Sequence, residues 1–216
     1  MPVKTCLEFR RGFFTVAGQP RQVARPRKEK CFFTVARNGF LYAFDTKPVM
    51  NKEEDLMQLK ENWKIDCNPQ SYRFKNGKAI KYAKPEGPSE IISTPVFYDD
   101  KVYVPIGQDP EHGTGLGNFV CADAVTGKVI WQTQKINRSI STPSITKDLI
   151  FISDFNGVLH CLDRKSGKTY WTHDTESHIW GSSLVADGKV YIGNEDGELY
   201  VLEAKKEKKV LANIYL

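Results

Sequence analysis

The protein has 216 residues, of which 40% are hydrophobic and 26% are charged, and its formal net charge is +5. This is the composition of an ordinary globular chain, so it excludes wholesale disorder and a coiled coil. No apolar run approaches the roughly 20 residues that cross a bilayer, and the first residues lack the apolar core of a signal peptide. We therefore expect no transmembrane segment, and no secretion signal is visible.

The basic character of the chain is concentrated at its start. Residues 1–30 hold eight Lys or Arg and two acidic residues, which leaves the rest of the chain close to neutral. Such a stretch can bind an acidic partner, but a solvated segment is the simpler interpretation. We expect residues 1–30 to be irregular or to add extra strands, and we expect no nucleic-acid partner because the body of the chain offers no basic groove.

The cysteine pattern argues against a disulfide framework. The five cysteines are an odd number, lie far apart and form no Cys-x-x-Cys pair: Cys6, Cys31, Cys67, Cys121 and Cys161. A disulfide scaffold or a thiolate zinc site needs paired spacing. We expect reduced thiols, most of them buried in strands.

A degenerate first repeat unit spans residues 31–66. Asp45 and Trp63 take the places of an Asp and a Trp that recur later, but 18 residues separate them instead of 8. The ten extra residues are rich in Lys, Glu, Leu and Met, a composition that is able to hold a short helix.

Three clearer copies follow, and they share one period. Equivalent residues are 40 apart: Asp123, Asp163 and Glu203; Gly127, Gly167 and Glu207; Trp131, Trp171 and Leu211. Each copy contains β-branched and aromatic runs separated by Asn-Gly, Asp-Gly or Ser-Gly pairs, which favours antiparallel hairpins. Four strands in a repeat of about 40 residues is the pattern of a β-propeller blade.

We therefore predict an all-β fold, a partial β-propeller with three complete four-stranded blades and a partial N-terminal blade. The complete blades are expected at about residues 90–134, 138–175 and 178–216, and the partial blade at 31–66, so that the repeats cover residues 31–216. Propellers close with four to eight blades. The open edge is explained by an incomplete segment of a longer propeller, which we favour, by a second copy that completes the ring, or by extra strands from residues 5–17.

The repeated Asp-x-x-Thr/Ser-Gly-Lys-x-x-Trp segment has a physical reason. The Asp can accept hydrogen bonds from the turn, the Gly can take a positive φ, and the Trp is placed to pack on the neighbouring blade. The segments CADAVTGKVIW and CLDRKSGKTYW resemble the tryptophan-docking repeats of the PQQ-type (quinoprotein) β-propellers, a family with both quinoprotein alcohol dehydrogenases and non-enzymatic, BamB-like assembly proteins. The resemblance implies structural docking roles for Asp123, Gly127, Trp131, Asp163, Gly167 and Trp171.

The same resemblance bears on cofactors and location. Family enzymes hold PQQ and calcium in a funnel closed by many blades, often beside a vicinal disulfide, whereas this chain has no Cys-Cys pair and about half the blades. We expect no bound cofactor; only the family resemblance suggests that PQQ or calcium could bind. The resemblance implies a periplasmic or other extracytoplasmic location, although the reduced thiols and the missing signal leave the cytoplasm open.

Two candidate sites remain. In the loop GQDPEHGTGLGN, Asp109, Glu111 and His112 could ligate a divalent cation, although a solvated hairpin tip is the simpler interpretation. Four residues lie where one blade leads into the next and form a candidate binding rim: Glu90, Arg138, His178 and Trp180.

The functional expectation is a binding scaffold. No Gly-x-Ser-x-Gly, His-Glu-x-x-His or P-loop motif is present. We therefore expect a non-catalytic propeller scaffold with a protein partner. The alternative is a fragment of a quinone- and calcium-dependent dehydrogenase.

Overall fold

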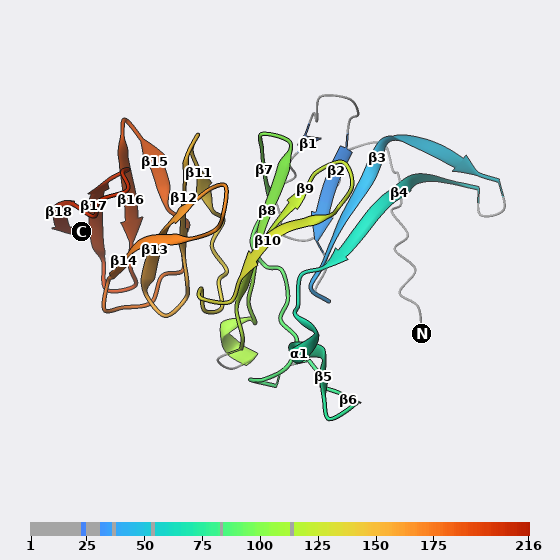
Figure 1. Ribbon diagram of the computed structural model, residues 1–216, viewed down its shortest axis with the longest axis horizontal. Helices are drawn as coiled ribbons and strands as arrows, with labels where there is room; N and C mark the ends of the chain where they lie inside the picture. Colours follow the sequence, from blue (N-terminus) through green and yellow to red (C-terminus); the bar gives the residue numbers. More distant parts are fainter. Residues whose placement is uncertain (1–22, 25–30, 36–37, 53–54, 83, 113–114) are drawn as a thin grey trace.

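The computed structural model describes residues 23–24, 31–35, 38–52, 55–82, 84–112 and 115–216. The predictions for residues 1–22, including the extra strands at 5–17, lie outside the described residues. The fold is all-β, as predicted, and its four antiparallel four-stranded sheets fan out from β3 and β4 at one end to β18 at the other (Figure 1). None of the helical segments in the described part of the chain has the length and apolar character needed to cross a membrane.

The four sheets, here called blades 1 to 4, follow each other along the chain. Blade 1 contains β1 (Val23–Ala24), β2 (Cys31–Val35), β3 (Phe40–Asn51) and β4 (Leu56–Asp66). Blade 2 contains β7 (Val96–Tyr98), β8 (Lys101–Ile106), β9 (Asn118–Asp123) and β10 (Val129–Thr133). Blade 3 contains β11 (Ser144–Ile145), β12 (Leu149–Ser153), β13 (Val158–Asp163) and β14 (Thr169–Asp174). Blade 4 contains β15 (Leu184–Ala186), β16 (Lys189–Gly193), β17 (Glu198–Glu203) and β18 (Val210–Tyr215).

Blades 1 and 2 are joined by a short irregular segment. It contains the helix α1 (Gln70–Arg73) and the small hairpin β5 (Phe74–Lys75) and β6 (Lys78–Ala79), and a 3-10 turn at Pro110–His112 interrupts blade 2. Arg73 forms an ion pair of 2.6 Å with Asp66 at the end of β4, and Tyr72 donates to the carbonyl of Gly117. These contacts fasten the connecting segment to the two blades it joins.

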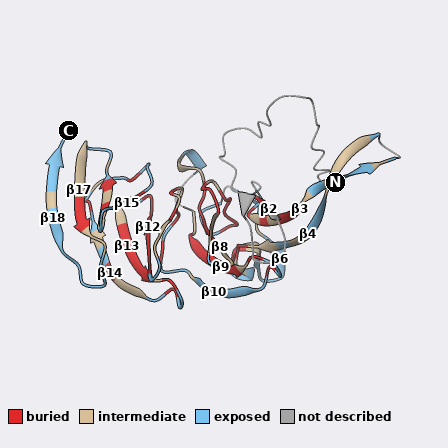
Figure 2. Ribbon diagram, turned by 90° about the horizontal axis from the view of Figure 1, so that it is seen from above, coloured by how far each residue is buried: buried red, intermediate tan, exposed pale blue. Residues whose placement is uncertain are grey.

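The core lies between neighbouring blades. Side chains alternate along a strand, so each sheet has one face toward the preceding blade and one toward the following blade. Phe151 and Cys161 of blade 3 pack with Val190 and Leu202 of blade 4, whereas Ile150 of blade 3 belongs to the cluster shared with blade 2. The middle strands of the blades are accordingly buried, while the outer strands β10 and β18 are largely exposed (Figure 2).

A ladder of hydroxyl groups joins the inner ends of blades 2 to 4. The amide of Thr94 donates to the Oγ1 of Thr142 (3.2 Å), and the amide of Thr142 donates to the Oγ of Ser182 (2.9 Å). The repeated Ser-Thr element therefore satisfies backbone groups of the preceding blade.

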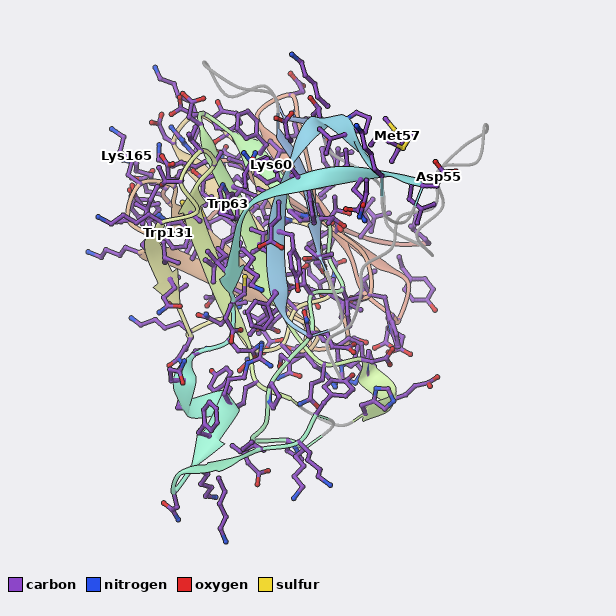
Figure 3. All side chains as sticks on the ribbon, turned by 90° about the vertical axis from the view of Figure 1, so that its right-hand side faces the viewer. Asp55, Met57, Lys60, Trp63, Trp131 and Lys165 are labelled. Atoms are coloured by element: carbon purple, nitrogen blue, oxygen red, sulfur yellow. The ribbon has the colours of Figure 1, made fainter. Side chains whose placement is uncertain are left out.

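Blade 1 differs from the prediction in two ways. It has four strands, although the first, β1, is only two residues long. The prediction of a short helix in the insertion is wrong. The inserted residues instead extend β3 and β4 into a long hairpin, in which Pro48 lies opposite Leu59 and Met50 lies opposite Met57. Pro48 disfavours a helix interior, and Asp55 takes a positive φ at the turn, so continued strand pairing accommodates the insertion. We call residues 46–51 and 56–61 the arm (Figure 3).

The sequence predicts a constant spacing of 40 residues between repeats. In the structure, the turn of the last repeat contains one additional residue. The amide of Asp163 bonds to the carbonyl of Lys168, whereas the amide of Glu203 bonds to that of Lys209, one residue further along. As a result Val201 pairs with Ala212, where Cys161 pairs with Trp171 in blade 3. The structural counterpart of the tryptophan in blade 4 is therefore Ala212, and the alignment of Leu211 with Trp171 was wrong.

Candidate functional site

Each of the first three blades sends a tryptophan from its outer strand onto the next blade. Trp63 donates from Nε1 to the carbonyl of Ala124 (3.2 Å), Trp131 to that of Arg164 (3.3 Å), and Trp171 to that of Lys205 (2.9 Å). The two labelled tryptophans Trp63 and Trp131 lie on the outer strands of adjoining blades in Figure 3. The indole N–H thus satisfies a carbonyl in the turn of the next blade that would otherwise accept a hydrogen bond from water.

A glycine in that turn makes the close approach possible. Gly127 has a φ of +70° and Gly167 a φ of +71°, the left-handed region that favours glycine. A Cβ on Gly167 would lie 2.6 Å from the Cε3 of Trp131, and one on Gly127 would lie 2.7 Å from the Cδ2 of Trp63. The glycine of each Asp-x-x-Thr/Ser-Gly turn therefore satisfies two constraints, one of backbone conformation and one of space.

The aspartate holds this turn in shape. The Oδ1 of Asp123 accepts from the amides of Val125 and Thr126 and from the Thr126 hydroxyl, and Asp163 makes the same set of bonds with Lys165 and Ser166. Burial raises the pKa of Asp123, but the hydrogen bonds from Thr126 and Val125 and the charge of Lys101 together lower it by more, so its net pKa lies below the ordinary value. The turn is thus organised around an ionised carboxylate.

The candidate rim residues occupy equivalent positions in three blades. The carbonyl of Glu90 accepts from the amide of Gly107 (3.0 Å), that of Arg138 accepts from Phe155 (2.9 Å), and that of His178 accepts from Glu195 (2.8 Å). Each rim residue thus precedes an inner strand and is tied to the segment that follows the second strand of its own blade. The three positions therefore lie at the same end of their sheets.

Three of the four rim residues converge on one phenylalanine. The Cζ of Arg138 lies 4.3 Å from the centre of the Phe155 ring, His178 stacks on that ring at 4.5 Å, and Trp180 meets it edge-on at 4.8 Å. The Nδ1 of His178 also lies 3.0 Å from the Phe155 carbonyl oxygen. Phe155 and Arg138 are buried, whereas 53% of Trp180 is exposed. The result is an aromatic cluster that is supported from below and open to solvent on top, here called the Phe155 cluster.

The guanidinium of Arg138, the charged group of this cluster, has little contact with solvent. Burial lowers the pKa of the Arg138 guanidinium, and the carboxylate of Asp109 opposes that effect. Asp109 therefore acts on the rim electrostatically. Glu90 is buried at the equivalent position of blade 2 and is not a member of the Phe155 cluster.

Sequence reasoning missed Phe155, the residue at the centre of the cluster. It lies in the turn Asp-Phe-Asn-Gly, where the flanking residues dominate the pattern. The available signal was its spacing: Gly107, Phe155 and Glu195 recur at the same offset after the rim residues. Phe155 is the aromatic member of this set.

The proposed cation ligands make local contacts instead. The Oδ1 of Asp109 accepts from the amide of Glu111 (3.0 Å), and the Nδ1 of His112 lies 3.1 Å from the hydroxyl of Tyr82. Across the described ranges, no three His, Cys, Asp or Glu side chains come together as a metal site would need. The described residues therefore do not bring Asp109, Glu111 and His112 together with the donor set that calcium needs.

His160 has a structural role. Its Nε2 lies 2.9 Å from the Oδ2 of Asp154, and both side chains are buried. Asp154 also accepts from Asn137 and from the amides of Asn156 and Val158. The pair organises the turn that carries Phe155.

The fold and the tryptophan contacts are those of a β-propeller, and its repeats are similar to those of the PQQ type. The family model described as "Outer membrane protein assembly factor BamB" matches residues 117–210 and supports the resemblance noted in the sequence. BamB of Shewanella oneidensis is 29% identical over 82 residues, covering 37% of this chain and 21% of that protein. The quinoprotein alcohol dehydrogenase PedH of Pseudomonas putida is 26% identical over 197 residues, covering 85% of this chain and 31% of that protein.

A solved structure agrees with this assignment of the fold. The crystal structure of BamB from Moraxella catarrhalis matches with a TM-score of 0.55 at 18% identity, covering 86% of this chain and 45% of that one. The chain thus spans less than half the length of the relatives it matches. Its similarity extends to an assembly factor and to an alcohol dehydrogenase alike, so the shared property is the propeller repeat.

Proposed function

We propose that the protein is a non-catalytic, PQQ-type propeller scaffold that binds a protein partner through the Phe155 cluster. The observation that carries the proposal is a half-exposed Trp180 seated on a buried Phe155 and flanked by Arg138. Trp is among the residues most enriched at the energetic hot spots of protein interfaces. By resemblance to BamB, the partner is a component of an outer-membrane assembly machinery and the location is extracytoplasmic.

The rigidity of the Phe155 cluster supports the interpretation that Trp180 binds a partner and is not simply exposed to solvent. The Phe155 backbone is hydrogen-bonded on both sides, its amide to the Arg138 carbonyl and its carbonyl oxygen within 3.0 Å of the His178 Nδ1. The stacked rings restrict the Trp180 side chain before a partner arrives. An ordered side chain loses less conformational entropy on binding, which favours affinity.

A photo-crosslinking amino acid at position 180 tests the proposal in cells that contain the natural partner. We expect it to capture one protein, identified by mass spectrometry, whereas the same group at the exposed Ile130 should capture none. Binding of that purified protein should weaken about tenfold or more in Trp180→Ala, because a central aromatic anchor contributes about 2 kcal/mol or more. Unchanged affinity in a folded Trp180→Ala variant would contradict the proposal.

A quinone-dependent dehydrogenase is the second candidate, favoured by the PedH match over 85% of this chain. The sequence offers Asp109 and Glu111 as calcium ligands for that candidate, although the described part of the structure brings no third carboxylate, histidine or cysteine beside them. Titration with PQQ and calcium, together with a dye-linked alcohol oxidation assay, separates the two candidates. Stoichiometric quinone binding that is lost in Asp109→Ala/Glu111→Ala would establish the dehydrogenase and overturn the scaffold.

A further inference from the structure

Trp180 offers an accessible indole face to a partner. Its ring meets Phe155 with perpendicular planes, at 4.8 Å between the two centroids. A perpendicular contact covers either an edge of the indole or one of its faces, so Phe155 leaves at least one face of Trp180 uncovered. A Cβ added to the next residue, Gly181, would meet nothing within 4 Å, and 53% of Trp180 is exposed. The indole is therefore open to a group that stacks on it.

The segments that surround this tryptophan are acidic. Residues 174–183 and 193–198 contain five Asp or Glu and no Lys or Arg. Four of the five are exposed: Asp174, Glu176, Glu195 and Asp196. Hydrogen bonds from Asn213, Asn194 and Tyr200 hold the pKa of the fifth, Glu198, below its ordinary value. All five side chains are therefore carboxylates at neutral pH.

Hydrogen bonds fasten the two acidic segments to each other and to the Phe155 cluster. The side chain of Asn194 donates to the carbonyl of Thr175 (3.0 Å). The amide of Glu195 donates to the carbonyl of His178 (2.8 Å), and the ring of His178 stacks on Phe155. The carboxylates and the aromatic cluster thus belong to one surface.

The cation of the Phe155 cluster leaves the sign of this surface unchanged. Arg138 is only 7% exposed, and its guanidinium faces the Phe155 ring at 4.3 Å. The exposed charges of the two acidic segments are all negative. A partner that approaches Trp180 therefore meets a negative potential.

The opposite end of blades 3 and 4 has the opposite sign. The strands β13 and β17 run from the rim to the turns at residues 163–168 and 203–209, which contain seven Lys or Arg and three Asp or Glu. Complementary charge steers a partner toward one surface and away from another. A basic partner is accordingly drawn to the Phe155 cluster and repelled by the other end, and the reverse holds for an acidic partner.

We propose that the Phe155 cluster binds a basic segment of its partner, with an arginine stacked on Trp180 and paired with the carboxylates of Glu195 and Asp196. The inference rests on the proposed function and specifies the chemistry of the partner. A guanidinium suits both features of the surface, because it stacks on an aromatic face and donates to carboxylates through a planar fork. Lysine matches the charge but has neither the plane nor the fork.

A peptide titration followed by NMR tests the proposal on the full chain. The probes are the blocked peptide Gly-Arg-Gly-Arg-Gly and the same peptide with citrulline in place of arginine, which keeps the shape and removes the charge. The indole N–H signal of Trp180 is identified by its loss in Trp180→Phe. We expect the arginine peptide to shift this signal with a dissociation constant at least about tenfold lower than that of the citrulline peptide. Added salt should weaken the arginine peptide alone.

Charge variants identify the carboxylates that take part. The double variant Glu195→Gln/Asp196→Asn should weaken the arginine peptide about threefold or more, because it removes two charges and keeps the side-chain shape. Asp187→Asn is the matched control. Asp187 is exposed in the turn at the other end of β16, so its neutralisation should leave the affinity unchanged. Unchanged indole signals of the three docking tryptophans verify that each variant is folded.

Several results would overturn the proposal: equal affinity for the two peptides, no shift of the Trp180 signal, or equal effects of the double variant and Asp187→Asn. Preference for the peptide Gly-Glu-Gly-Glu-Gly would also overturn it and would assign the cluster to an acidic segment. Failure of the proposed function is a separate result, in which the protein captured at position 180 binds Trp180→Ala with unchanged affinity. If only the present inference fails, that binding still depends on Trp180 but does not respond to Glu195→Gln/Asp196→Asn.

Discussion

Replacing Gly167 with alanine measures how much the tryptophan contact between blades contributes to stability. Gly167 combines a φ of +71° with a position against the ring of Trp131, where a Cβ would lie 2.6 Å from the Cε3 atom. Alanine at a left-handed position costs about 1–2 kcal/mol because its Cβ approaches the backbone. Forcing a methyl group into a packed site costs about 1–3 kcal/mol more, since the indole must shift.

The matched control is Gly188, which has nearly the same backbone and an open surrounding. Its φ is +68°, and nothing lies within 4 Å of the Cβ that alanine would add. Gly188→Ala should therefore show the backbone cost alone, about 1–2 kcal/mol. The difference between the two variants, about 1–3 kcal/mol, is the packing cost against Trp131.

Urea unfolding followed by circular dichroism gives both free energies of unfolding, and a double-mutant cycle isolates the contact. In a Trp131→Leu background the cost of Gly167→Ala should fall toward that of Gly188→Ala, because the smaller side chain leaves room for the methyl group. Equal costs for Gly167→Ala and Gly188→Ala in the native background would refute the reasoning.

Three further predictions follow from buried polar and titratable groups. Asp154→Ala should lower the free energy of unfolding by about 2–4 kcal/mol, because it leaves buried donors without an acceptor. Asp148 is exposed, so Asp148→Ala should change that free energy by less than about 0.5 kcal/mol in the same urea assay. Burial, with Lys208 nearby, lowers the pKa of His173 below its usual 6.5, so the unfolded chain takes up the proton first and stability should fall as pH drops below that value. His173→Gln should flatten the decline between pH 7.5 and 5 in urea unfolding, and an equal slope in both proteins would contradict this. Burial raises the pKa of Cys121 and of Cys161 to about 12, so iodoacetamide should leave both unmodified in the native protein at pH 8 and label both in urea, as peptide mass spectrometry can show.

The sequence predicts the architecture well because the repeat is enforced by local chemistry. Asp123, Gly127 and Trp131 stand close together in sequence, and their spacing alone specifies a turn and an outward tryptophan. The prediction fails where the repeat is altered. The insertion after Asp45 has a helix-like composition, but pairing with the facing strand decides its structure, and the extra residue between Glu203 and Lys209 shifts the register in a turn that lacks the glycine.

The repeat predicted that the rim residues occupy equivalent positions, but it did not predict which side chains meet there. Repeat spacing places Arg138 and His178 at equivalent points, and Trp180 follows close behind. Their convergence on Phe155 depends on how the turn after β12 bends toward the next blade, which is a tertiary property. Short-range patterns contain no information on such contacts, so the centre of the cluster could be found only from the structure.

The contact made by Trp131 and Gly167 is directional, since blades 2 and 3 each give a tryptophan to the following blade and receive one from the preceding blade. A blade copied by gene duplication therefore carries both halves of the joint with it and fits its neighbours without a compensating substitution. Blade 1, with the arm in place of the glycine turn, and blade 4, with Ala212 in place of the tryptophan, each carry only one half of this joint.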